Sequence, residues 1–250
     1  MFSALIYNPI YNLLIAILDF ISSDVGIAII IVTILIKIML FPLAKSAIKT
    51  QIGMKKIKPE QDVIQKKYKK KAGKIDPEDR QKMALELMQL YKTNNVRPFL
   101  SILIVFIQIP ILLGLYWIIY TGGLPEVDAS RLYSFIPVPD MVSMSFLGIF
   151  DLTERSILLS LLAGVAQFVH TRLSIEIPEK KVVPTGEIPS MKDDFARSFA
   201  VQMRYGLPVL IGITSYFFGS AVAIYFITTG LFSMVQEYLV RKDKAELKAI

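Results

Sequence analysis

One stretch decides the fold: GIAIIIVTILIKIMLFPL, residues 26–43. At about 1.5 Å per residue, this apolar run is long enough to cross the roughly 30 Å of a bilayer's hydrocarbon core. A single charge, Lys37, interrupts it. A charge at such a depth costs about 2.5–3.5 kcal/mol on insertion scales, so it normally faces protein or water and serves a function. Two alternatives stay open for Lys37: a water-filled cavity within the protein, or a stem that snorkels toward the bilayer surface.

The composition extends this reading to the whole chain. Hydrophobic residues make up 54% of the 250 positions and charged residues 20%, with no cysteine and a single histidine, His170. The histidine count excludes multi-histidine metal sites, and we expect neither a metal nor a cofactor. Five apolar runs are long enough to span, so the predicted fold class is an all-α polytopic membrane protein with five transmembrane helices. These runs are residues 25–44, 98–121, 153–173, 200–218 and 219–240.

The charges outside these runs predict an orientation. Residues 45–97 hold fifteen Lys and Arg against six acids, whereas residues 122–152 hold one basic residue against four acids. The tail, residues 241–250, is basic. The positive-inside rule places residues 45–97, the loop 174–199 and the tail in the cytoplasm, and residues 122–152 and the N-terminus outside.

The basic segment 45–97 is predicted to form a cytoplasmic helical hairpin. Lys49–Lys71 and Pro77–Thr93 both have helical periodicity, and Asp76 and Pro77 suit the start of the second helix. Apolar faces are expected at Ile57, Ile64 and Tyr68, and at Ala84, Leu87, Met88 and Tyr91. The basic exterior favours anionic lipid, at about 1 kcal/mol per residue near the surface, and it would also suit a ribosome or a nascent chain. No specific nucleic-acid site is predicted.

Residues 1–24 are apolar but contain Asn8, Pro9, Asn12 and Asp19. They lack the basic start of a signal peptide. We expect a helix on the outer interface over Asn12–Ser22, with lipid-facing side chains at Leu13, Leu14, Ile17 and Ile21. A sixth span is the alternative, although it would break the alternation of basic and acidic loops between the two sides of the membrane.

Polar residues within the predicted spans gather toward the cytoplasmic side. Thr33 and Lys37 are four apart and share one helix face. Gln108 lies near the middle of the second span, and Gln167 and Ser233 lie in the inner halves of the third and fifth. The pattern predicts a hydrophilic groove open to the cytoplasm and closed outside. Each glutamine taken singly also suits an ordinary interhelical hydrogen bond. His170 is expected at the interface, without an identified partner.

Several motifs carry a resemblance. They are Thr33-Ile-Leu-Ile-Lys37 followed by Phe41-Pro42-Leu43, Gln108-Ile109-Pro110-Ile111 with Leu115-Tyr116-Trp117, Phe146-Leu147-Gly148-Ile149-Phe150-Asp151-Leu152, and Tyr225-Phe226-Ile227-Thr228 with Leu231 to Tyr238. In this order and spacing the chain resembles the minimal five-span core of the YidC family of membrane protein insertases. The family's groove residue is usually arginine, and lysine here is a point charge without the planar fork of arginine.

The resemblance implies a function in a bacterial cytoplasmic membrane: moving newly made membrane proteins into the bilayer, alone or beside the Sec translocon and the ribosome. It implies that Lys37 and Thr33 lie in the groove and that Ile109, Leu112 and Phe226 form an apolar slide for the incoming span. No protease motif is present, so an enzyme is not expected. The remaining alternatives are a small transporter or channel subunit and an assembly chaperone without insertion activity.

Overall fold

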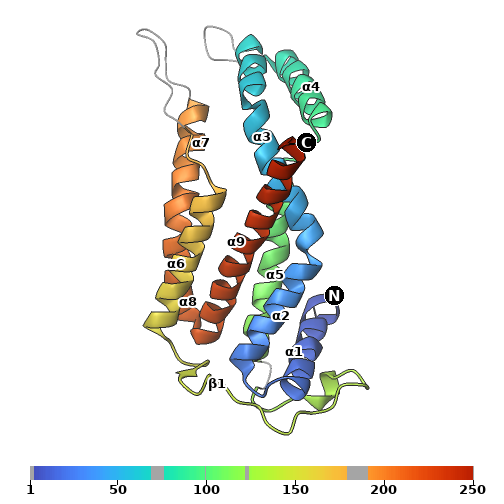
Figure 1. Ribbon diagram of the computed structural model, residues 1–250, viewed down its shortest axis with the longest axis vertical. Coiled ribbons are helices and arrows are strands. Elements are labelled where there is room, and N and C mark those ends of the chain that lie inside the picture. Colours follow the sequence, from blue (N-terminus) through green and yellow to red (C-terminus); the bar gives the residue numbers. More distant parts are fainter. Residues whose placement is uncertain (1–2, 69–75, 99, 122–123, 179–190, 250) are drawn as a thin grey trace. The chain divides into compact units, whose positions relative to one another are not determined.

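A computed structural model describes residues 3–68, 76–98, 100–121, 124–178 and 191–249 (Figure 1). The described chain is mostly helical and forms two compact units. The first unit comprises Met1–Met39 with Ile109–Tyr238, and the second comprises Leu40–Gln108 with Leu239–Ile250. The helices are η1 Ser3–Tyr7, α1 Asn8–Phe20, α2 Val25–Met39, α3 Phe41–Tyr68, α4 Pro77–Thr93, α5 Leu100–Tyr120, η2 Ala129–Arg131, α6 Ile157–Ser174, α7 Met191–Val201, η3 Gln202–Gly206, α8 Leu207–Phe218 and α9 Ser220–Ala249.

Three helical stretches within the described residues are long and apolar enough to cross a membrane: Ser3–Phe20, Ile157–Ser174 and Ser220–Lys242. The pair α2 and α3, interrupted at Leu40, makes a fourth if it is counted as one broken span. The apolar part of α5 within the described side chains, Phe106–Tyr120, is shorter. These features are those of a helical membrane protein, and the arrangement of five spans stays a prediction.

The N-terminal helix differs from the expectation. Helical structure begins at Ser3 rather than Asn12, and α1 packs against α2. Leu14 and Ile17 are buried in the core of the first unit, so the prediction that they face lipid is wrong, whereas Ile21 is exposed. The reason is tertiary, because the apolar face of α1 covers α2 instead of lying on a membrane surface.

Asn12 is a polar residue on the buried face of α1, and its hydrogen bonds explain why it is tolerated there. Its side chain is 1% exposed, and its Nδ2 donates to the backbone carbonyls of Asn8, at 2.8 Å, and Arg131, at 2.9 Å. Its Oδ1 accepts the backbone N–H of Tyr133 at 2.6 Å. The preceding residue of α1 strengthens this junction, since the Tyr11 hydroxyl accepts a hydrogen bond from the backbone N–H of Asp128 at 2.8 Å. The middle of α1 is therefore fastened to the segment 124–133.

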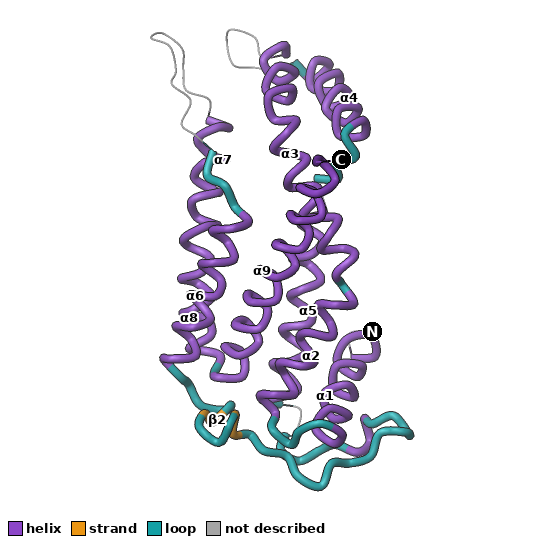
Figure 2. The backbone as a smooth tube through the Cα atoms, viewed as in Figure 1, coloured by secondary structure: helices purple, strands orange, loops and turns teal. Residues whose placement is uncertain are grey.

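The segment 124–152 is mostly loop, with one small hairpin of β1 (Ser145–Phe146) and β2 (Phe150–Asp151) (Figure 2). Asp24 joins this hairpin to α2. Its carboxylate accepts the backbone N–H of Gly26 at 2.7 Å and of Ile27 at 3.1 Å, which caps the helix, and the N–H of Leu147 at 2.7 Å. One acidic side chain thus fixes both the start of α2 and the tip of the loop.

The helices α6 and α8 approach each other through two glycines. A Cβ at Gly164 would lie 3.3 Å from the carbonyl oxygen of Pro208, and a Cβ at Gly212 would lie 3.5 Å from the carbonyl oxygen of Ser160. The two glycine Cα atoms face each other, so the backbones come close without intervening side chains. This crossing is the main packing contact between helices of the first unit.

The second unit contains the predicted helical hairpin, whose placement in the cytoplasm stays a prediction. Its helices α3 and α4 pack together, and Pro77 is the first helical residue of α4 with Asp76 at its N-cap, as expected. The first helix begins at Phe41 rather than Lys49, and residues 72–75 of the turn expected at 72–77 lie outside the described residues. Ile57 is buried, in agreement with the expected face of α3.

The predicted apolar face of α4 is partly wrong. Ala84 and Met88 are exposed, whereas Met83, Leu87, Leu90 and Tyr91 are half-buried. At the far end of α3, the Glu86 carboxylate accepts hydrogen bonds from the Lys67 ammonium at 2.6 Å and the Tyr68 hydroxyl at 2.7 Å. These two donors hold the pKa of Glu86 below its usual value, and the hydrogen bond from Lys67 has the larger effect.

Candidate functional site

Lys37 lies two residues before Met39, the last residue of α2, and is directed at α9. Its Nζ donates to the Ser233 hydroxyl at 3.3 Å. The Gln236 side-chain amide of α9 donates to the backbone carbonyl of Lys37 at 3.1 Å. The last four carbonyls of a helix have no partner within it, so Gln236 satisfies one of those left by α2. Both the charge and the backbone of Lys37 are therefore held by the same turn of α9.

The other predicted groove residues differ in their surroundings. Thr33 is 2% exposed, and its hydroxyl donates to the backbone carbonyl of Ile29 at 2.7 Å, so this hydroxyl is used within α2. Gln167 is buried on α6. Gln108 is half-buried on α5, and it is the last residue of the segment Leu40–Gln108 that belongs to the second unit. The structure brings Lys37 and Ser233 together, and the groove roles of the other three stay predictions.

Sequence analysis missed a buried acid beside this pair. Glu237 follows Ser233 by one helical turn on the same face of α9 and is 3% exposed. The Ser174 hydroxyl of α6 donates to its carboxylate, and the Nε2 atom of His170 lies 3.9 Å from the carboxylate oxygen. His170, for which no partner was identified from the sequence, therefore lies against an acid. The i, i+4 spacing of Ser233 and Glu237 was the available signal.

Together these contacts join three helices around two opposite charges. Lys37 comes from α2, the pair His170 and Ser174 from α6, and the remaining partners from α9, which runs beside α2 in the first unit (Figure 1). Ser233 and Glu237 are about 6 Å apart along the axis of α9, at about 1.5 Å per residue.

The predicted slide residues are apolar and unequally exposed. Ile109 is 50% exposed, while Leu112 and Phe226 are partly buried and pack against the core of the first unit. The ring of Phe226 also meets the ring of Tyr225 edge-on, with centroids 5.4 Å apart. An exposed Ile109 suits contact with lipid or an incoming span, and the assignment of a slide stays a prediction.

The fold and this site define a helical membrane protein with a lysine held between apolar helices. A family model described as 60Kd inner membrane protein matches residues 17–247. The chain belongs to this family.

Curated relatives are similar in sequence to this chain over most of its length. The chain is 30% identical to the membrane protein insertase YidC of Fusobacterium nucleatum over 243 residues, which cover 94% of this chain and 98% of that protein. It is 31% identical to the membrane protein insertase MisCB of Bacillus subtilis over 240 residues, 94% of this chain and 78% of the relative. With YidC of Oceanobacillus iheyensis the identity is 28%, over 88% of this chain and 76% of the relative. Membrane insertase is thus the functional class of the family.

Proposed function

We propose that this chain inserts newly made membrane proteins into a bacterial cytoplasmic membrane through a hydrophilic groove that contains Lys37. Membership of the family and the names of the relatives support the function. The observation that carries the groove is the contact of the Lys37 ammonium with Ser233, because it directs a charge in an apolar run at a neighbouring helix. The predicted residues Thr33, Gln108 and Gln167 complete the groove.

The proposed role of Lys37 is electrostatic. Moving an acidic residue of a substrate to the bilayer centre costs about 2.5–3.5 kcal/mol on insertion scales. An ammonium in the groove lowers that cost while the outer segment of the substrate crosses. A negative charge that moves outward also gains about 2.3 kcal/mol per 100 mV of membrane potential. Substrates with acidic outer segments should therefore depend most on Lys37.

The apolar span of the substrate then leaves sideways. Ile109, Leu112 and Phe226 offer it an apolar surface, and burial of apolar area in lipid contributes about 25 cal/mol per Å². The exposure of Ile109 supports this role, since an incoming helix needs a side chain that it can reach.

For the topology, we propose five spans with the N-terminus outside and the C-terminus in the cytoplasm. The basic charges of residues 45–97 and 241–250 support a cytoplasmic location for these segments. The hydrogen bonds of Tyr11 and Asn12, in the middle of α1, to the backbone of the segment 124–133 support an outer location for residues 1–24, since that segment is itself proposed to lie outside. The basic hairpin would meet anionic lipid, the ribosome or the Sec translocon.

Crosslinking to a stalled nascent membrane protein tests the proposal. A photoreactive residue at Ile109 or Phe226 should crosslink to the apolar span of the substrate, and one at the buried core position Leu14 should not. Depletion of the protein separates insertion from assembly. An insertase defect leaves the outer segments of substrates accessible to protease on the cytoplasmic side, whereas a defect of an assembly chaperone leaves them translocated but unassembled.

A further inference from the structure

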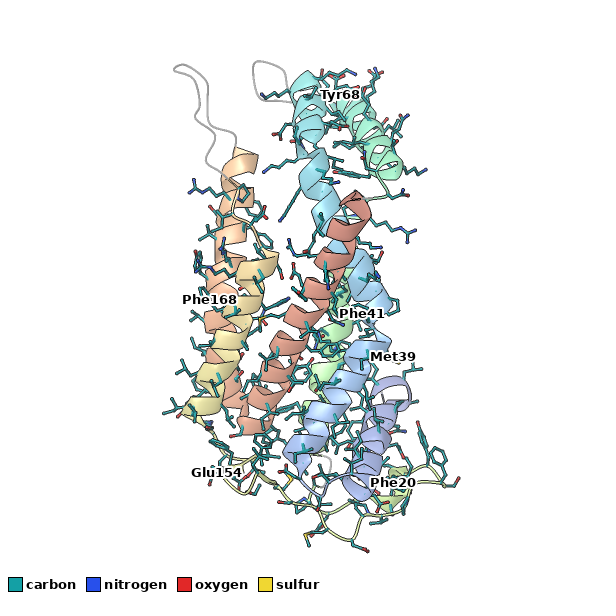
Figure 3. The ribbon with its side chains drawn as sticks, viewed as in Figure 1. Phe20, Met39, Phe41, Tyr68, Glu154 and Phe168 are labelled. Carbon is teal, nitrogen blue, oxygen red and sulfur yellow. The ribbon has the colours of Figure 1, made fainter. Side chains whose placement is uncertain are left out.

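An apolar groove runs along the surface where α6 and α8 cross. It encloses about 690 Å³. Gly164 and Gly212 form its floor, and its walls are apolar side chains such as Leu161 and Val165 on α6 and Val209 and Ile213 on α8. These wall residues are largely exposed, so the groove is open to its surroundings. Phe168, labelled in Figure 3, lines the end of the groove that is nearer to the C-terminus of α6.

A second pocket, with an arginine in its wall, adjoins this end of the groove. It encloses about 480 Å³ and is lined by Arg197, Ser198 and Gln202, with Val201 and Gly206. Tyr205 lines both the groove and the pocket, so the two form one continuous surface. The ring centroid of Tyr205 lies 6.0 Å from that of Phe168, so the wall of the groove continues into the wall of the second pocket.

Arg204 adds a second positive charge at this junction. Its guanidinium lies over the ring of Tyr205, with 5.8 Å from Cζ to the ring centroid. Its Nε is buried, and no atom of the described residues accepts a hydrogen bond from it. A buried guanidinium N–H normally has an acceptor. Arg204 itself lines neither the groove nor the pocket, but it lies over Tyr205, which lines both, and the pocket contains a second arginine, Arg197.

We propose that the groove and the pocket bind one anionic phospholipid. One acyl chain lies in the groove over Gly164 and Gly212, and the phosphate lies against Arg204 and Arg197. Guanidinium groups recognise phosphate oxygens through paired N–H donors, and basic pockets beside transmembrane helices suit anionic headgroups. A second helix fits the groove less well, because the two glycines that permit close helix approach already face each other. In the proposed topology this end lies at the cytoplasmic leaflet.

The test uses quenching of a single tryptophan by brominated lipid. The full-length protein with Trp117→Phe and Phe168→Trp carries its only tryptophan in the groove. It is placed in vesicles that contain either dibrominated phosphatidylglycerol or dibrominated phosphatidylcholine at equal mole fractions. Quenching should indicate a relative association constant about fivefold higher for phosphatidylglycerol, the factor that corresponds to about 1 kcal/mol for a basic residue at a lipid phosphate.

Matched charge variants locate the headgroup. Arg204→Gln and Arg197→Gln should each reduce the preference for phosphatidylglycerol, and the double variant should abolish it. Arg155→Gln is the control, because Arg155 lies over Tyr216 and Phe217 at the opposite end of the same groove. The preference should be unchanged in this control. Equal association constants for the two lipids in the parent protein would overturn the proposal, as would a preference that is lost in Arg155→Gln but kept in the double variant.

Discussion

The Lys37 ammonium on α2 donates to the Ser233 hydroxyl on α9 across 3.3 Å, although the two residues are separated by nearly two hundred positions in the chain. The amide of Gln236, close to Ser233 on α9, secures the backbone of the same lysine at 3.1 Å. The charge is therefore fixed in position by a neighbouring helix. A fixed charge of this kind is what an electrostatic role in insertion requires.

Ser233→Ala should destabilise the contact between α2 and α9. A hydrogen bond to a charged group contributes about 1.5–3 kcal/mol, and partial exposure of Lys37 places the expected loss near the lower value. Unfolding of the protein in mixed micelles by added denaturing detergent measures the loss. Ser233→Thr keeps the hydroxyl and serves as the control. Equal stability of the alanine variant and the parent would show that the hydroxyl does not hold Lys37.

Glu237→Leu should destabilise the packing of α6 against α9 more than Glu237→Gln. The leucine variant leaves the half-buried Ser174 hydroxyl without its acceptor, at a cost of about 1 kcal/mol, while glutamine keeps an acceptor oxygen. The same unfolding assay compares the two variants. If both lose the same stability, the negative charge rather than the hydrogen bond dominates this contact.

Gly164→Ala and Gly212→Ala should differ, although both glycines lie at the crossing of α6 and α8. Alanine gains about 0.5–1 kcal/mol over glycine within a helix. At Gly212 the new Cβ would meet its nearest neighbour at an ordinary 3.5 Å, and we expect this variant to be neutral or more stable. At Gly164 the nearest neighbour is a backbone oxygen at 3.3 Å, so strain should offset the gain. Thermal unfolding ranks the two, and the reverse order would contradict the crossing geometry.

Glu86 should titrate below the usual pH range of a glutamate. Its pKa is lowered by the hydrogen bonds from Lys67 and Tyr68, so the folded state binds this proton less tightly than the unfolded state does. The contribution of Glu86 to stability is therefore present above its unfolded pKa and is lost as the pH falls through the folded pKa. Carbon-13 NMR of labelled glutamate in the full protein follows the titration. The midpoint should rise in Lys67→Ala, and an unchanged midpoint would contradict the contact.

The sequence predicted features that depend on local chemistry. Pro77 begins α4 because proline suits the first turn of a helix, and Asp76 precedes it at the cap. Lys37 was identified because one charge in an apolar run needs a reason. Contacts between distant segments of the chain could not be predicted from local sequence patterns. Burial of Leu14 depends on the packing of α1 against α2, and satisfaction of Asn12 depends on a loop more than a hundred residues away.

Two errors have separate physical causes. The apolar stripe of α4 is displaced from Ala84 and Met88 toward Met83 and Leu90, because spacings of three and four residues allow several neighbouring faces. Glu237 was overlooked because it lies where the last apolar run gives way to basic residues, a position that usually faces the membrane interface. Only the packing of α6 against α9 reveals that its carboxylate is buried.

The central claim is most directly tested by the insertion of a matched pair of substrates. One carries acidic residues in its outer segment, and the other carries neutral replacements at the same positions. The measured quantity is the fraction of outer segment protected from protease in membranes containing the parent protein, Lys37→Ala, Lys37→Arg or the exposed-charge control Lys58→Ala. Lys37→Ala should reduce protection of the acidic substrate selectively, while Lys37→Arg and Lys58→Ala preserve it. Insertion of the acidic substrate by Lys37→Ala at the level of the parent would contradict the account.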